Sequence, residues 1–147
     1  MRKPKLFIAL LRIAVGWLFL YQGVLAIQNS SWSLLDKIKD AKTFPDFYNL
    51  ISANPIFLQY ATYAAKGIFI ISGVLLILGI GVRIASFLGI LLMAFFYFAI
   101  LNFPRVGTSY YIVDEHLIYI IILLYLLVFS KKKESLGLGS LFRSSRY

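Results

Sequence analysis

The sequence predicts an all-α membrane protein: a four-transmembrane-helix bundle with a short amphipathic extracytoplasmic loop between helices 1 and 2. Two observations support this fold class. Of the 147 residues, 61% are hydrophobic and only 14% are charged, whereas a soluble domain has about 45–50% apolar and about 25% charged residues. The apolar residues also gather in four long runs, each near the roughly 17–25 residues that cross a hydrocarbon core as a helix. We therefore expect residues 1–147 to form a single integral membrane domain.

The four apolar runs place the expected helices at about residues 6–27, 57–80, 84–102 and 113–130. None of the runs has the alternating pattern of a barrel strand, and only helices or closed barrels satisfy the backbone in lipid. The first run begins with basic residues, as a signal peptide does. However, it exceeds the roughly 7–15 apolar residues of such a peptide and contains Arg12. We expect it to be retained as a helix.

The distribution of basic residues predicts the orientation, because cytoplasmic flanks carry an excess of lysine and arginine. The flanks assigned to one side of the membrane carry these basic residues: Arg2, Lys3, Lys5, Arg83, Lys131, Lys132, Lys133, Arg143 and Arg146. We expect both termini to be cytoplasmic, in a prokaryotic cytoplasmic (inner) membrane. The tail 131–147 is then a basic cytoplasmic end whose charges favour anionic lipid. The loop 28–56 faces outward.

The outer loop 28–56 has two amphipathic pieces. Ser33 is a plausible N-cap for the first, in which Leu34, Leu35, Ile38 and Ala41 share a helical face. The second piece follows a turn at Pro45. Two arrangements remain open at this point. The pieces are either short helices on the membrane surface, with Trp32 as an interfacial anchor, or an ordered cap packed over the bundle.

Three stretches carry a family resemblance: LLRIAVGWLFLYQGVLAI, KGIFIISGVLLILGIGVRIASFLGILLM and VDEHLIYIIILLYLL. Together they resemble the DoxX/DoxD-like family of small four-helix integral membrane proteins. The resemblance implies a membrane subunit linked to thiosulfate:quinone oxidoreductase or to another oxidoreductase; distant relatives act as cargo receptors or assembly chaperones. The chain departs from the family at two positions. The family's histidine near the end of helix one is replaced by Tyr21-Gln22-Gly23, and its glutamate opening helix two by Lys66.

Six polar residues near the outer helix ends form a candidate quinone or proton site: Gln22, Lys66, Asp114, Glu115, His116 and Tyr119. A histidine titrates near neutral pH and could relay protons during quinone chemistry. The alternative explanations are structural. Acids at a helix start complement the helix dipole, and an amide in lipid commonly bonds a neighbouring helix. Lys66 could reach water or pair with Asp114 or Glu115.

A second group of residues lies deeper in the predicted helices. Arg12 is a candidate intramembrane charge, which either extends to the lipid headgroups or holds a specific partner or anionic ligand. Four glycines are expected at helix-packing contacts, since they let helices approach closely: Gly16, Gly23, Gly73 and Gly79. Tyr97 could point at a quinone-like ring.

The residue inventory limits the chemistry. The chain has no cysteine and one histidine, so we expect no cysteine-ligated cluster, no bis-histidine haem and no metal site. The net charge of +9 lies in flanks and loops, so we expect lipid and other membrane subunits as partners, and no nucleic acid. The sequence favours a non-catalytic accessory subunit that acts as a scaffold or docking partner in a membrane complex. The alternative is a quinone-linked oxidoreductase membrane subunit with an outer-face polar or quinone site, whose redox cofactor would be quinone itself or would reside in a partner. A small-molecule transporter is a distant third.

Overall fold

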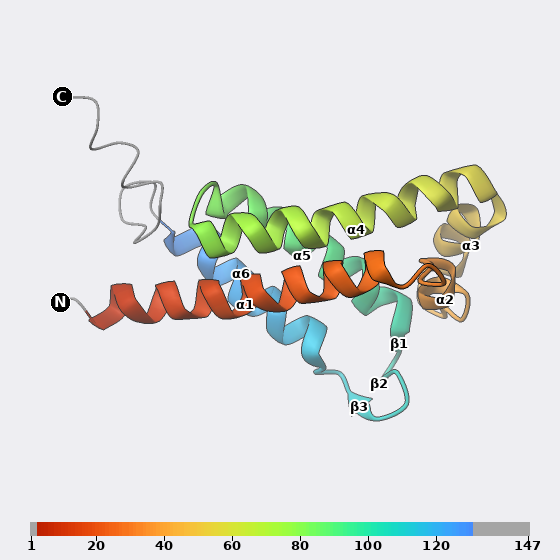
Figure 1. The fold of residues 1–147 in the computed structure, drawn as a ribbon. Helices are drawn as coiled ribbons and strands as arrows, with labels where there is room; N and C mark the ends of the chain where they lie inside the picture. Colours follow the sequence, from red (N-terminus) through yellow and green to blue (C-terminus); the bar gives the residue numbers. More distant parts are fainter. Residues whose placement is uncertain (1–2, 131–147) are drawn as a thin grey trace.

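A computed structural model describes residues 3–130, and the expected basic tail, residues 131–147, lies outside them. The longer helices lie alongside one another, with smaller elements at one end (Figure 1). The elements in chain order are α1 (Lys3–Gln28), α2 (Leu35–Ile38), α3 (Pro45–Ala53), α4 (Pro55–Leu78), α5 (Val82–Ile100), β1 (Leu101–Asn102), β2 (Arg105–Val106), β3 (Tyr110–Tyr111) and α6 (Glu115–Phe129).

Three of the described helices are long and apolar enough to cross a membrane: Leu6–Gln28, Pro55–Leu78 and Val82–Ile100. Their outer faces expose large apolar side chains, as lipid contact requires; Trp17 is 61% exposed and Ile84 is 65% exposed. Helix α6 is apolar but has only 15 residues, fewer than the roughly 20 of a full span. The expected mostly helical membrane architecture is therefore confirmed.

Local sequence explains where α4 begins and ends. The Asn54 side chain caps its start by accepting hydrogen bonds from the N–H groups of Ile56 and Phe57, at 3.0 and 3.2 Å. Its end is set by Gly79, whose φ of 73° is left-handed and suits glycine. The helix therefore stops at Leu78, two residues before the expected position 80.

Helix α5 ends at Ile100, and the next two residues join a small antiparallel sheet in the order β1-β2-β3. Leu101 pairs with Val106, and Arg105 pairs with Tyr111. The sequence gives no sign of this sheet, because strands of two residues are too short to show a pattern.

Residues 29–54, called the cap below, pack on the bundle rather than lying apart from it. Leu34 and Ile38 are each only 2% exposed, and the Tyr48 hydroxyl donates a 2.7 Å hydrogen bond to the Phe95 carbonyl of α5. Ser33 accepts a hydrogen bond from the Leu35 N–H at 3.2 Å, but α2 has only four residues. Of the two arrangements open at the sequence level, the structure has the packed one.

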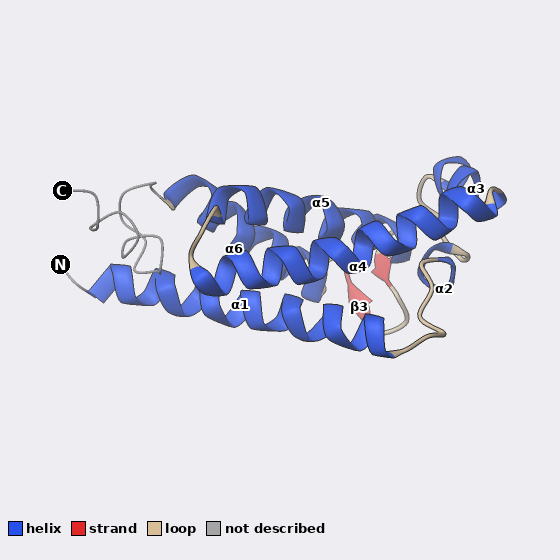
Figure 2. Cartoon of the chain, turned by 45° about the horizontal axis from the view of Figure 1, so that its top comes forward, coloured by secondary structure: helices blue, strands red, loops and turns tan. Residues whose placement is uncertain are grey.

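The four longer helices follow one another around the bundle. Helix α1 packs most closely on α4, α4 also packs on α5, and α5 packs on α6, whereas α1 and α6 touch only lightly. Figure 2 shows α4 between α1 and α5. The bundle is thus closed on three sides and loose on the fourth.

Glycines explain the tight contact between α1 and α4. A Cβ atom on Gly73 would lie 2.5 Å from the Leu20 backbone nitrogen, and one on Gly23 would lie 2.6 Å from Ile70 Cγ1. A Cβ atom on Gly16 would lie 2.9 Å from Leu76 Cβ. No side chain fits at these distances, so the two backbones approach as in other small-residue contacts between membrane helices.

Candidate functional site

A cavity of about 290 Å³ lies inside the bundle near the cap. Its apolar walls come from α1, α4 and α5: Leu18, Phe19, Phe69, Met93, Phe96 and Ile100. Its more polar lining comes from α1, the cap and the start of α6: Gln22, Trp32, Lys37, Glu115, His116 and Tyr119. A cleft or cavity with apolar walls and a few convergent polar groups is the usual form of a small-molecule site.

Beside the cavity, His116 and Asp114 form a hydrogen-bonded pair. Nδ1 of His116 lies 2.6 Å from Oδ2 of Asp114, whose side chain is 2% exposed. The other carboxylate oxygen accepts a 3.1 Å hydrogen bond from the Leu117 N–H and so caps α6. Because Nδ1 is engaged by Asp114, Nε2 is the nitrogen that remains for a ligand. Asp114 thus caps the helix and orients the histidine at once.

The structure brings four of the six predicted polar residues to one cavity: Gln22 from α1, and Glu115, His116 and Tyr119 from α6. Asp114 stands directly behind His116. These residues come from opposite ends of the sequence, and only the fold places them around one space.

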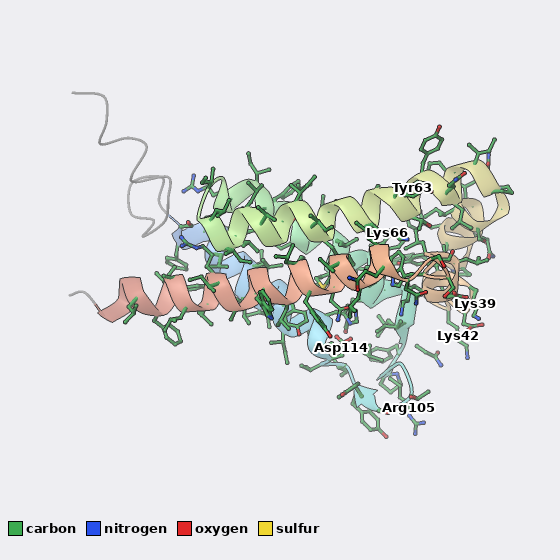
Figure 3. The ribbon with its side chains drawn as sticks, viewed as in Figure 1. Lys39, Lys42, Tyr63, Lys66, Arg105 and Asp114 are labelled. Carbon is green, nitrogen blue, oxygen red and sulfur yellow. The ribbon has the colours of Figure 1, made fainter. Side chains whose placement is uncertain are left out.

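Lys66 does not join this group. Its Nζ lies 5.4 Å from the centre of the Trp32 ring, a distance that allows cation–π attraction. Within residues 3–130, no ion pair joins Lys66 to Asp114 or Glu115. Figure 3 shows Lys66 on α4 and Asp114 at the start of α6. In the structure the Lys66 ammonium group lies over the Trp32 ring, and Asp114 is hydrogen-bonded to His116 instead.

Two residues of the more polar lining, Trp32 and Lys37, were not among the predicted site residues. Trp32 was expected as an interfacial anchor, but it is half-buried and lines the cavity. Which face of the cap meets the bundle depends on tertiary packing, so sequence spacing could not reveal either residue. Tyr97 was suggested to face the ring, but its hydroxyl donates a 2.6 Å hydrogen bond to the Ile112 carbonyl. Its neighbour Phe96 lines the cavity instead.

Arg12 lies at the opposite end of the bundle from the cavity and is only 3% exposed. Its guanidinium sits against Gly79, where a Cβ atom would be 2.7 Å from one terminal nitrogen. Gly79 was expected between helices, but it ends α4 and leaves room for Arg12. A cation at a helix C-terminus complements the helix dipole.

Comparison with known protein families agrees with this architecture. The family model DoxX matches residues 7–102, well over half of the chain. The chain belongs to the DoxX family. The DoxX match spans α1, the cap, α4 and α5, and the Asp114–His116 pair follows it in the sequence. No curated protein and no solved structure matches this DoxX-family chain. The described residues contain no group of three His, Cys, Asp or Glu side chains that could hold a metal ion.

Proposed function

We propose that this DoxX-family membrane protein is an accessory subunit that holds a quinone-type ring for a partner oxidoreductase. The single observation that carries the proposal is the cavity beside the Asp114–His116 pair. Its volume of about 290 Å³ is near the lower end of the roughly 300–1,000 Å³ typical of ligand pockets. A cavity of that size suits a single small ring.

The lining suits a flat ring with polar oxygens. Phe69 and Phe96 are stacked with centroids 6.0 Å apart and planes 14° apart, and Phe19 meets Phe69 edge-on at 5.6 Å. Aromatic walls of this kind favour an aromatic or quinonoid guest. The Gln22 amide on one helix and the His116 imidazole on another are hydrogen-bonding groups available to ring oxygens.

A bound quinone would supply two-electron, two-proton chemistry. The chain's part is to orient the ring and to handle protons. When His116 is protonated, Asp114 stabilises the imidazolium and Nε2 can give up its proton, which leaves a neutral imidazole still bonded to Asp114. Glu115, exposed at the rim, can exchange protons with water.

Electrons come from the partner in this proposal. The sequence has no cysteine and a single histidine, so this chain lacks the ligands of a cysteine-bound cluster or a bis-histidine haem. Its role is therefore accessory: it offers the ring site, and a second subunit carries the redox centre.

The second candidate is a scaffold that docks another subunit without using the cavity. It is favoured by exposed apolar side chains on α3 and at its N-cap: Phe44 is 63% exposed, Phe47 52% and Leu50 71%. Exposed apolar patches mark contact sites with proteins or lipid. This candidate predicts full complex activity when the cavity is altered.

We also propose four crossings, with both termini cytoplasmic and the cap outside. The first described residues of α1 and the last of α6 lie at the same end of the bundle as the α4–α5 hairpin (Figure 1), and Arg83 Nε donates to the Ser130 carbonyl at 3.2 Å. Helix α6 spans roughly 22 Å, so it crosses only if the membrane thins or its ends lie below the headgroups. A carboxy-terminal reporter that is accessible from outside the cell contradicts this topology.

Fluorescence tests the ring site, because the chain has two tryptophans and only Trp32 lines the cavity. In the Trp17→Phe variant, added benzoquinone should quench the fluorescence of Trp32, and the quenching should reach saturation. The further substitution His116→Gln should weaken the binding of the benzoquinone. The matched control is Trp32→Phe, whose remaining Trp17 is 61% exposed on the outer face of α1; its quenching should not saturate. Equal, unsaturable quenching in both proteins contradicts the ring site. Full activity of the native complex after Gln22→Leu and His116→Gln favours the scaffold.

A further inference from the structure

We infer that the ring enters sideways from the lipid, through an opening between α1 and α6, and leaves a long apolar tail in that opening. The inference rests on the proposed function, since it takes the cavity to be the ring site. It adds the class of ligand: a membrane-dissolved ring with a tail, rather than a water-soluble ring.

The burial of the cavity walls is one-sided. On α4 and α5 most of the lining is buried: Phe69 is 7% exposed, Met93 4% and Phe96 6%, while Ile100 at the end of α5 is half-buried. On α1 and α6 the lining includes exposed residues, among them Leu18 at 38% and also Glu115. The opening therefore lies on the side of α1 and α6, which are also the neighbouring helices that touch least.

The route along the bundle axis is closed toward the membrane centre. Phe19 is 2% exposed and Leu123 is not exposed at all. Both press on Gly89 of α5, where a Cβ atom would lie 2.9 Å from Leu123 Cδ1 and 3.1 Å from Phe19 Cε1. Phe19 lines the cavity, and together with Leu123 it fills the space against Gly89, so a tail cannot continue down the bundle interior.

The rim of the opening changes from polar to apolar. Lys37 and Glu115 line it at the cap end, and Leu18 lies further along α1. Away from the cap the rim is apolar, since Leu18 is a large apolar side chain that is 38% exposed. Gln22 lies about 9 Å from the end of α1 by helical rise, within the candidate span Leu6–Gln28. A polar ring with an apolar tail matches this order of surfaces.

The size of the cavity also indicates that a tail leaves the cavity between α1 and α6. A space of about 290 Å³ holds a small ring but not a long isoprenoid or alkyl chain as well. Any tail must leave through the α1–α6 opening, and there it meets lipid.

Photochemical labelling tests the inference directly. The protein is placed in phosphatidylcholine vesicles with a benzoquinone whose ten-carbon tail ends in a diazirine. After irradiation, labelled peptides are mapped by mass spectrometry, with and without excess tail-less benzoquinone. Labels should concentrate on α1 and α6, and the tail-less ring should compete them away.

The other outcomes separate the two proposals. Labels on the outer faces of α4 and α5 that excess tail-less ring removes contradict the opening between α1 and α6. They do not contradict the ring site. If excess tail-less ring does not reduce the labelling at any position, then no ring occupies the cavity. That result contradicts the proposed function itself.

A matched pair of variants sharpens the test. Leu18→Phe should narrow the opening and lower labelling by the tailed ring several-fold, whereas Trp32 quenching by the tail-less ring persists in the Trp17→Phe background. Ile13→Phe changes a 44% exposed residue of the same helix that does not line the cavity, and it should leave both readouts unchanged. Equal labelling of the two variants contradicts entry beside Leu18.

Discussion

Helix α1 packs closely on α4 but only lightly on α6. We assign the stability of the bundle to the first side of α1 and ligand binding to the second. Toward α4, Gly16 and Gly23 allow backbones to touch. Toward α6, Leu18 and Gln22 leave a cavity and an opening. Without a hydrophobic driving force between helices in lipid, close packing of small residues holds the helices together. We infer that the α1–α4 contact supports the bundle, so that the α1–α6 side can stay open.

The largest expected effect is at the α1–α4 contact. Gly73→Ala places a Cβ atom 2.5 Å from the Leu20 backbone nitrogen and should cost about 3 kcal/mol in free energy of unfolding, the upper part of the overpacking range. The matched control is Gly67→Ala in the same helix, where nothing lies within 4 Å; it should be neutral or slightly stabilising. Unfolding in mild detergent measures both. Equal stability of the two variants would contradict the claim that the α1–α4 contact supports the bundle.

A smaller effect is expected where Arg12 meets α4. Gly79→Ala and Gly81→Ala both put a side chain at positive φ, 73° and 59°, at a cost of roughly 1–2 kcal/mol. Only Gly79→Ala also meets Arg12, so it should cost about 1 kcal/mol more. That excess should vanish in the Arg12→Ala background, as a double-mutant cycle can show. An excess that survives without Arg12 contradicts the contact.

The cap, where it packs on α5, should respond to alkaline pH. Burial raises the pKa of Tyr48 from its ordinary value near 10 to about 12, and its hydroxyl donates to the Phe95 carbonyl. The protonated phenol is thus favoured in the folded state. Its stabilisation is full below pH 10 and is lost as the pH rises through 12.

Tyr48→Phe should remove this pH dependence and cost about 1 kcal/mol at neutral pH. Proteolysis of the cap, followed as a function of pH, measures the change, and Tyr60→Phe, at a 71% exposed position, is the control. An unchanged pH profile in Tyr48→Phe refutes this role.

The smallest effect is expected at the opening itself. Leu18→Ala removes a partly exposed side chain beside empty space, so the free energy of unfolding should change by no more than about 0.5 kcal/mol. Chemical unfolding in the same detergent checks this. A loss of several kcal/mol would mean that Leu18 is a packing residue and that the α1–α6 side is not open.

The sequence could predict which segments form the long apolar helices, because these follow from the composition along the chain. The long apolar runs locate α1, α4 and α5, because a helix in lipid must be apolar over its length. Glycine spacing on α1 indicates the face that meets α4. The loose α1–α6 side could not be predicted, because it depends on how four helices close around one another.

The Asp114–His116 pair shows why site geometry escapes sequence analysis. Residues at i and i+2 on a helix do not face each other, so helical spacing would separate them. Asp114 instead precedes the helix in extended conformation, with φ −125° and ψ −175°, which brings its carboxylate onto the His116 ring. Arg12 is similar, since its guanidinium lies against Gly79, which ends another helix.

One measurement tests the central claim, that the cavity binds a ring at His116. His116 is the only histidine in the chain, so protein labelled with ¹⁵N-histidine gives the two ring-nitrogen resonances of this single site. We predict that Nδ1 carries the proton donated to Asp114, and that a saturating tail-less benzoquinone shifts the Nε2 resonance while Nδ1 stays protonated. An Nε2 resonance that does not move when the ring is added would contradict the proposed site.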